Sequence, residues 1–139
     1  MDRKSRERPP QTIRIVIADD HPIFRQGLRV LLEAESGFAV AGEAADGEET
    51  VRLCRQLKPD VLLLDLAMPK MPGMEALRQL AASASPVRTI LLAAAVETEQ
   101  IAEALQLGAR GVVLKHSATE VLLKGIRAVM ASEKAAAIT

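Results

Sequence analysis

Four charged residues stand at the carboxyl ends of apolar segments in this 139-residue chain. They are Asp19, Asp20, Asp65 and Lys115. If these segments are parallel strands of one sheet, their carboxyl ends meet at one edge and the four side chains converge. Three carboxylates in one crevice repel one another, so a hard divalent cation with oxygen ligands is expected there. This donor set favours Mg²⁺ over zinc, because no cysteine stands near either of the two histidines.

A divalent cation beside a carboxylate, with a lysine across the pocket, is an arrangement that handles a phosphoryl group. The cation and the ammonium neutralise the phosphoryl oxygens while a carboxylate attacks in line. Asp65 is the better nucleophile candidate because it stands alone, whereas Asp19 and Asp20 are adjacent and suit metal binding. Taken singly, Asp20 could cap a helix and Lys115 could be a solvated lysine. Only the joint pattern favours a phosphoryl site.

Apolar runs and amphipathic segments alternate along the chain from residue 13 onward. We predict five strands, at 13–18, 38–43, 61–65, 87–93 and 111–114. We predict five helices, at 22–34, 47–57, 73–82, 97–107 and 117–131. Since no hairpin signal lies between the strands, the order predicts an α/β fold with a doubly wound parallel sheet and helices on both faces.

The composition excludes several classes of protein. Lys plus Arg and Asp plus Glu both number 18, and this zero net charge disfavours a general nucleic-acid-binding surface. Phe24 and Phe38 are the only aromatic residues, so the core must be aliphatic. The single cysteine, Cys54, stands in an apolar pattern and is expected to be a buried, inert thiol in a reducing cytoplasm. The longest apolar run, 90–96, is too short to span a membrane.

Three stretches resemble the receiver domain of bacterial two-component response regulators, most closely the NarL/FixJ (LuxR-type) class. They are IRIVIADDHPIFRQGLRVLLE (13–33), DVLLLDLAMPKMPGMEAL (60–77) and ALQLGARGVVLKHSATEVLLKGI (104–126). The DDHP, DLxMP and GAxGxxxK elements occur in the family's order and spacing. This resemblance implies a flavodoxin-like fold with strand order 2-1-3-4-5 and five helices.

The resemblance also implies roles for individual residues. Asp65 matches the aspartate that a sensor histidine kinase phosphorylates, and Asp19 and Asp20 match the acidic pair that holds Mg²⁺. Ala67 matches the position whose backbone carbonyl completes the metal site with Asp65, and Lys115 matches the lysine that pairs with the phosphoryl oxygens. The chain is then a signalling phosphoprotein of the cytoplasm and not an enzyme.

Two switch positions depart from the family pattern. Such receivers usually carry serine or threonine at the end of the fourth strand and an aromatic residue in the fifth, where this chain has Ala93 and Val112. An alanine methyl forms no hydrogen bond, which removes about 1.5–3 kcal/mol of differential stabilisation of a charged oxygen. A protein-interaction module with weak or no phosphorylation-driven switching is therefore an alternative function.

The resemblance also sets the expected boundaries and partners. We predict a flexible leader at 1–12, the receiver domain at 13–131 and the start of a linker at 132–139. We expect a chain cut at a domain boundary rather than a stand-alone receiver. Its partners are then a sensor histidine kinase and, only through a missing C-terminal domain that regulates transcription, DNA. No membrane partner is expected.

The last predicted helix carries three consecutive apolar residues, Val121, Leu122 and Leu123. This stripe is wider than one core-facing side of a helix needs. We predict that part of it forms a symmetric homodimer contact, with or without the first helix.

Other interpretations of the same residues are weaker. A Mg²⁺-dependent phosphohydrolase generally has a second carboxylate two residues after its nucleophile, where this chain has Ala67. Dinucleotide binding lacks a G-x-G-x-x-G motif after the first strand. His21 follows the acidic pair and is expected to be a surface histidine on the first turn of a helix.

Overall fold

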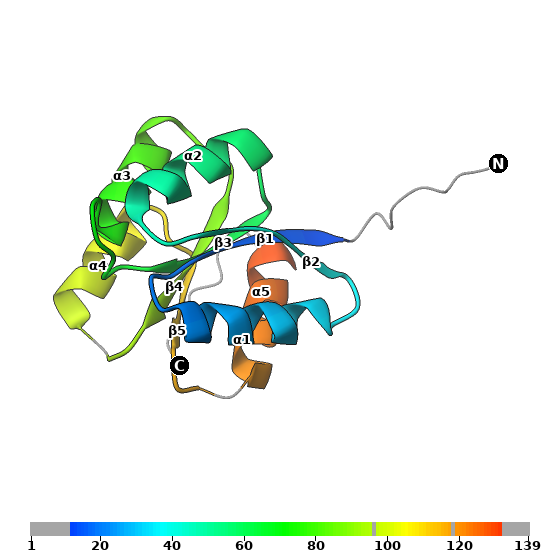
Figure 1. Ribbon diagram of the computed structural model, residues 1–139. Helices are drawn as coiled ribbons and strands as arrows, with labels where there is room; N and C mark the ends of the chain where they lie inside the picture. Colours follow the sequence, from blue (N-terminus) through cyan, green and yellow to red (C-terminus); the bar gives the residue numbers. More distant parts are fainter. Residues whose placement is uncertain (1–11, 96, 118, 132–139) are drawn as a thin grey trace.

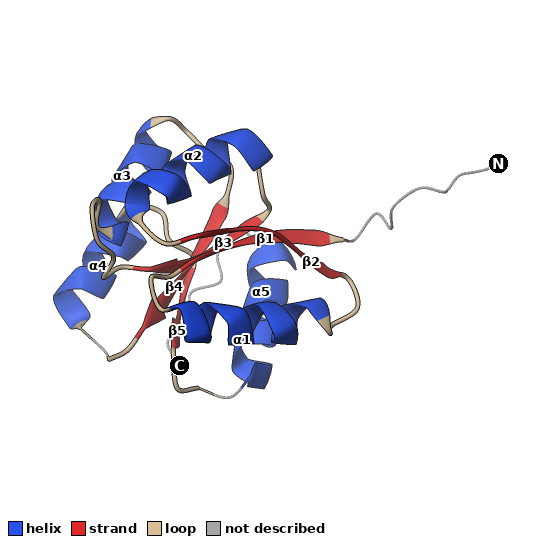
Figure 2. Cartoon of the chain, viewed as in Figure 1, coloured by secondary structure: helices blue, strands red, loops and turns tan. Residues whose placement is uncertain are grey.

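The computed structural model describes residues 12–95, 97–117 and 119–131. The leader predicted at 1–12, apart from Thr12, and the linker predicted at 132–139 lie outside these residues. Strands and helices alternate, as the sequence predicts (Figure 2). In chain order the elements are β1 (Ile13–Ala18), α1 (Pro22–Glu33), β2 (Phe38–Ala44), α2 (Gly47–Leu57), β3 (Val61–Asp65), α3 (Gly73–Ala82), β4 (Arg88–Ala93), α4 (Thr98–Gln106), β5 (Gly111–Leu114) and α5 (Thr119–Ala131).

The five strands form one parallel sheet in the order β2-β1-β3-β4-β5. Helices α1 and α5 cover one face of this sheet, and α2, α3 and α4 cover the other (Figure 1). The doubly wound, flavodoxin-like fold is therefore confirmed. The strand order changes direction between β1 and β3, which is where such sheets bind their ligands.

Side chains of the central strand alternate between two aliphatic cores. Val61 and Leu63 of β3 pack with residues of α1 and α5, whereas Leu62 and Leu64 pack with residues of α2, α3 and α4. All five residues of β3 are buried, because helices cover both faces of the sheet. Alternate residues of a strand lie on the same face, so Asp65, at the carboxyl end of β3, lies on the α1–α5 side with Val61 and Leu63.

Local chemistry explains where the elements begin and end. Asp46 caps α2 by accepting a hydrogen bond from the backbone N–H of Glu49 at 2.8 Å, as expected for a short polar residue at this position. The prediction that the last helix begins at 117 is wrong. Ser117 instead donates its backbone N–H to the carbonyl of Leu114, closing a turn after β5, and α5 begins at Thr119.

The predictions from composition that concern the core agree with the structure. Cys54 is a free, buried cysteine on α2, and burial raises the pKa of its thiol to about 12. Phe38 is buried among aliphatic side chains of the α1–α5 face. Across the described ranges, every helix is too short or too polar to cross a membrane.

Candidate functional site

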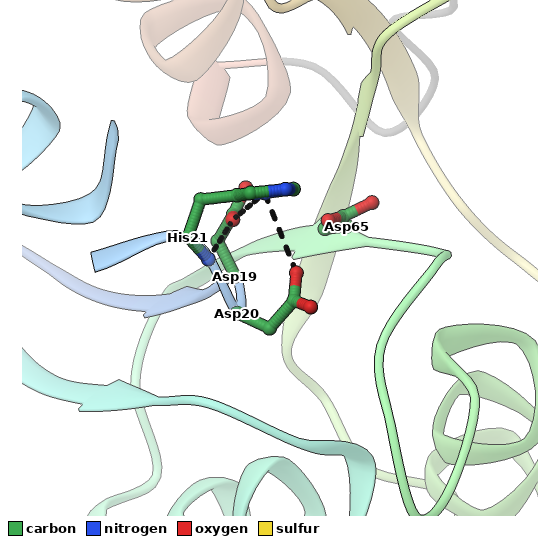
Figure 3. A group of neighbouring side chains, drawn as sticks. All are labelled: Asp19, Asp20, His21 and Asp65. Carbon is green, nitrogen blue, oxygen red and sulfur yellow. Dashed lines mark hydrogen bonds and ion pairs between the residues drawn. The ribbon is translucent and has the colours of Figure 1, made fainter. Parts of the chain in front are cut away.

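The acidic residues predicted to converge do meet at the carboxyl edge of the sheet (Figure 3). Asp19 and Asp20 follow β1, and Asp65 ends the neighbouring strand β3. One side-chain ligand atom from each of these residues and from His21 lies within 4.8 Å of all the others. Asp19 and Asp65 are buried, whereas the side chain of Asp20 is 31% exposed, so the cluster opens toward solvent on the side of Asp20.

Asp65 is held by a donor on each of its carboxylate oxygens. The backbone N–H of Ala67 donates to Oδ1 at 3.0 Å, and Nζ of Lys115 donates to Oδ2 at 3.1 Å. Burial raises the pKa of the Asp65 carboxyl above its usual value, although both hydrogen bonds act in the opposite direction. The result is a poorly solvated carboxylate at a fixed position, which suits a nucleophile.

Lys115 lies between the two buried carboxylates. Its Nζ is 2.7 Å from Oδ2 of Asp19 and 3.1 Å from Oδ2 of Asp65. Burial by itself lowers the pKa of the ammonium, but the interactions with Asp19 and Asp65 outweigh it and the pKa is raised. Lys115 therefore stays protonated and supplies a fixed positive charge beside Asp65.

His21 joins the site in a way that the sequence analysis did not anticipate. Its side chain is 66% exposed, as expected for a surface histidine. Its backbone N–H, however, donates to Oδ1 of Asp19 at 2.8 Å, and its Nδ1 lies 3.0 Å from the same oxygen. The first contact is a turn in which an aspartate side chain accepts from the residue two positions on. The sequence Asp-Asp-His-Pro is a signal for such a turn.

Two buried carboxylate oxygens of the cluster accept no hydrogen bond from a described residue: Oδ2 of Asp19 and Oδ1 of Asp20. The first forms only the ion pair with Lys115, and the second lies 3.4 Å from Nδ1 of His21. A buried oxygen without a close donor, such as Oδ1 of Asp20, is uncommon in proteins and indicates a missing partner such as an ion. An all-carboxylate donor set that opens to solvent fits Mg²⁺, which binds oxygen ligands and retains water.

Two glycines hold the loop that follows Asp65. Gly73, the first residue of α3, donates its backbone N–H to the carbonyl of Leu66 at 2.9 Å. A Cβ at Gly73 would lie 2.4 Å from the backbone oxygen of Asp65, and one at Gly47 would lie 2.1 Å from the backbone oxygen of Met71. No side chain fits at either place, so both close contacts depend on glycine. The spacing of residues in the sequence does not predict these two contacts, because each contact joins segments that only the fold brings together.

Residues 15–127 match the family described as the response regulator receiver domain. The chain belongs to this family. It is 37% identical over 122 residues to the response regulator UvrY of Escherichia coli K12, a match that covers 88% of this chain and 56% of UvrY. It is 38% identical over 121 residues to the transcriptional regulatory protein LiaR of *Bacillus subtilis*, covering 87% of this chain and 57% of LiaR. The chain thus spans about half the length of these curated relatives.

Solved receiver structures have the same fold. The signal receiver domain of a NarL response regulator from Mycobacterium tuberculosis is 35% identical with a TM-score of 0.84, covering 88% of this chain and 99% of that one. A LuxR-family response regulator from Aurantimonas sp. SI85-9A1 is 37% identical with a TM-score of 0.83, covering 90% of this chain and 89% of that one. The predicted NarL/LuxR-type receiver is therefore confirmed.

The two residues predicted to occupy the switch positions, Ala93 and Val112, lie in β4 and β5. Ala93 ends β4, and its backbone oxygen accepts a hydrogen bond from the backbone N–H of Lys115 at 2.7 Å. Its methyl lines a cavity of about 230 Å³ that Asp65 also lines. Val112 is buried in the core opposite Leu91 of β4. Neither residue offers Asp65 a side-chain hydrogen-bond donor.

Among the described residues that line the cavity beside Asp65, none carries a side-chain hydroxyl. The two nearest threonines in the sequence are Thr89 and Thr98. Thr89 pairs with Leu62 at the opposite end of β4, and Thr98 is exposed at the start of α4. Neither lines the cavity beside Asp65.

Proposed function

We propose that this receiver domain accepts a phosphoryl group on Asp65 from a sensor histidine kinase. The observation that carries the proposal is the setting of Asp65, a buried carboxylate fixed by Ala67 and Lys115 within reach of the acidic pair Asp19 and Asp20. Membership in the receiver family supports the same conclusion.

The chemistry assigned to these residues is an in-line phosphoryl transfer. A carboxylate oxygen of Asp65 forms a bond to phosphorus while the P–N bond to the kinase histidine breaks, and the histidine nitrogen keeps the bonding electrons. Lys115 offsets negative charge on the phosphoryl oxygens. Asp19, Asp20, Asp65 and the backbone carbonyl of Ala67 would hold Mg²⁺, which would supply further positive charge beside the phosphoryl oxygens.

We further propose that the phosphorylated domain passes its state to an output domain outside this chain. The names of relatives such as LiaR, a transcriptional regulatory protein, support a DNA-binding output domain, since each relative is about twice as long as the matched region. In this proposal residues 13–131 are the receiver, 132–139 begin a linker, and the protein acts in the cytoplasm. A pure interaction module is not favoured, because the whole acidic and lysine donor set is in place.

We also propose that the receiver forms a homodimer through the face that carries the last helix. The three consecutive apolar residues of α5 are not all available for this contact, because Val121 and Leu123 pack against the core shared with α1. Exposed apolar side chains lie instead on the adjacent helix α1. The proposed contact therefore includes α1.

Incubation with acetyl phosphate and Mg²⁺, followed by intact-protein mass spectrometry, tests the phosphorylation proposal. We expect a mass increase of one phosphoryl group that is lost in Asp65→Asn and in the presence of EDTA. Asp60→Asn is a matched control, since Asp60 is a carboxylate at the opposite end of β3, bonded to the backbone N–H of Arg14. No mass increase at saturating acetyl phosphate, or an unchanged increase in Asp65→Asn, would overturn the proposal.

A further inference from the structure

The side chain of His21 lies within the acidic cluster, but the phosphoryl transfer proposed above gives it no role. In Figure 3 its ring extends over the carboxylates of Asp19 and Asp20 toward Asp65. One ring nitrogen is within 4.8 Å of a carboxylate oxygen of Asp65. A polar ring so close to the proposed phosphoacceptor is expected to interact with a group that is attached there.

The local backbone fixes the position of His21 but leaves its ring free to turn. His21 precedes the first residue of α1, Pro22, and its side chain forms no hydrogen bond that caps the helix. Its backbone N–H donates to Oδ1 of Asp19 at 2.8 Å, which holds the residue at the edge of the site. The side chain itself is 66% exposed. The ring can therefore change its orientation without loss of the helix start or of core packing.

Nδ1 of His21 is placed as a hydrogen-bond donor. It lies 3.0 Å from Oδ1 of Asp19 and 3.4 Å from Oδ1 of Asp20, and two carboxylate oxygens at these distances favour the tautomer with hydrogen on Nδ1. Oδ1 of Asp19 also accepts the backbone N–H of His21, so it keeps a donor if the ring turns away. The N–H of the ring is thus available to another acceptor at little cost.

Lys115 stands next to this donor. Its Nζ is 3.3 Å from Nδ1 of His21 and 3.1 Å from Oδ2 of Asp65, and it lies 4.9 Å from the centre of the Phe24 ring. An ammonium and an N–H do not satisfy each other, but an anionic oxygen between them can accept from both. A phosphoryl group on Asp65 would bring such oxygens to this place.

We propose that Nδ1–H of His21 donates a hydrogen bond to a phosphoryl oxygen on Asp65, beside Lys115. His21 thereby supplies a side-chain donor to the phosphoryl group, which finds no hydroxyl at Ala93. The inference rests on the proposed phosphorylation of Asp65 and adds a second phosphoryl-binding side chain to it. A phosphoryl group carries more negative charge than a carboxylate and has three acceptor oxygens, so it can accept from both donors.

His21 fits this role better than the polar side chains of the cavity beside Asp65. Apart from Asp65, that cavity has two polar lining side chains, Glu97 and Gln100. The carboxylate of Glu97 has no hydrogen to donate and repels a phosphoryl group. Gln100 has an amide donor but is exposed near the start of α4. His21, in contrast, already lies next to Lys115.

Binding of beryllofluoride to the full chain in the presence of Mg²⁺, followed by ¹⁹F NMR, tests the proposal. Beryllofluoride serves as the phosphoryl mimic. His21→Leu removes the donor and should raise the dissociation constant of the mimic about tenfold or more, because a hydrogen bond to a charged acceptor is lost. His21→Asn should largely restore the affinity, since its amide offers an N–H in place of Nδ1. His116→Leu, at an exposed histidine outside the acidic cluster, is the matched control and should bind like the wild type.

The affinity for Mg²⁺ alone, measured by calorimetry without the mimic, separates this role from an effect on the cation. We expect it to be the same in His21→Leu and in the wild type. A dissociation constant of the mimic that is unchanged in His21→Leu, or raised equally in His21→Asn, would overturn the donor role. An equal loss of Mg²⁺ affinity would also overturn it.

The same measurements distinguish failure of this inference from failure of the proposed function. If the wild type neither binds the mimic nor is modified by acetyl phosphate, the proposed function fails. If the wild type does both and His21→Leu matches it, only the present inference fails.

Discussion

At the scale of single residues, the site depends on the ammonium group of Lys115, which lies between two buried carboxylates. Lys115 offsets the charge of Asp65 and Asp19 at distances of 3.1 Å and 2.7 Å. The interaction is strong because all three groups are largely removed from water, where charges attract and repel with little screening. The pKa of Asp65 is therefore set by opposing effects: burial raises it, and the hydrogen bonds from Ala67 and Lys115 lower it.

Replacing Lys115 should raise the pKa of Asp65 further. Burial already raises it, and Lys115→Met removes the nearest positive charge that favours the ionised carboxylate. Titration of the labelled Asp65 carboxyl carbon by NMR, with EDTA present, measures this pKa directly. Lys124→Met, at an exposed position on α5, is the control and should leave it unchanged. An Asp65 pKa that falls in Lys115→Met would contradict the electrostatic account.

Replacing Gly73 and Gly27 by alanine should change the stability of the fold in opposite directions. Gly73→Ala forces a Cβ against the backbone oxygen of Asp65 and should destabilise the fold by about 1–3 kcal/mol. Gly27→Ala meets no atom in the interior of α1 and should stabilise it by about 0.5–1 kcal/mol, because alanine is the better helix former. Urea unfolding at low protein concentration measures both. Equal effects of the two substitutions would contradict the close contact at Gly73.

At the scale of elements, β2 at the edge of the sheet is tied to α1 by charges. Arg25 donates Nε to Glu43 at 2.8 Å, and Arg29 donates to the other oxygen of the same carboxylate. Burial alone raises the pKa of Glu43, but the hydrogen bonds from Arg29 and Arg25 outweigh it and the pKa is lowered. The contact holds the helix that contains Phe24 against the sheet.

This contact gives stability a definite pH dependence. The pKa of Glu43 is lower in the folded protein than in the unfolded chain. Ionised Glu43 therefore makes its full contribution to the free energy of unfolding at any pH above the unfolded-state pKa, and this contribution is lost as the pH falls through the folded-state pKa. The difference in unfolding free energy between wild type and Glu43→Gln should therefore be largest near neutral pH and shrink below about pH 4. Urea unfolding of both proteins across this range measures it. A difference that grows toward acid pH would contradict the assignment.

The elements also show how far the sequence predicts the structure. Strands such as Ile13–Ala18 and Val61–Asp65 have the predicted bounds, because their apolar β-branched or aliphatic runs end at charged or polar residues. The predicted start of α5 is wrong because Ser117 lies in a turn, closed by a hydrogen bond from its backbone N–H to the carbonyl of Leu114. Such a turn leaves little trace in the amino-acid composition. The contact of His21 with Asp19 is local and is signalled by the sequence Asp-Asp-His-Pro, whereas the close approach at Gly73 depends on how the loop after β3 folds back on Asp65.

At the scale of the whole molecule, the parallel sheet explains why a few scattered residues form one site. Successive side chains of a strand point to opposite faces of the sheet. In β1, β3 and β5 the odd-numbered residues face α1 and α5, and this alternation places Asp19, Asp65 and Lys115 on the same side of the carboxyl edge. Their convergence follows from the fold class, which the sequence predicts. The same face also carries the exposed apolar side chains of α1, so the site and the proposed homodimer contact are neighbours.

The position of the transferred phosphoryl group tests the central claim most directly. After reaction with acetyl phosphate and Mg²⁺, reduction of the acyl phosphate with borohydride converts a phosphorylated aspartate to homoserine, which tandem mass spectrometry locates within a peptide. The account predicts homoserine at position 65 alone, formed only when Mg²⁺ is present. Homoserine at Asp19, Asp20 or Asp60 with Asp65 intact, or none anywhere after complete reaction, would contradict it.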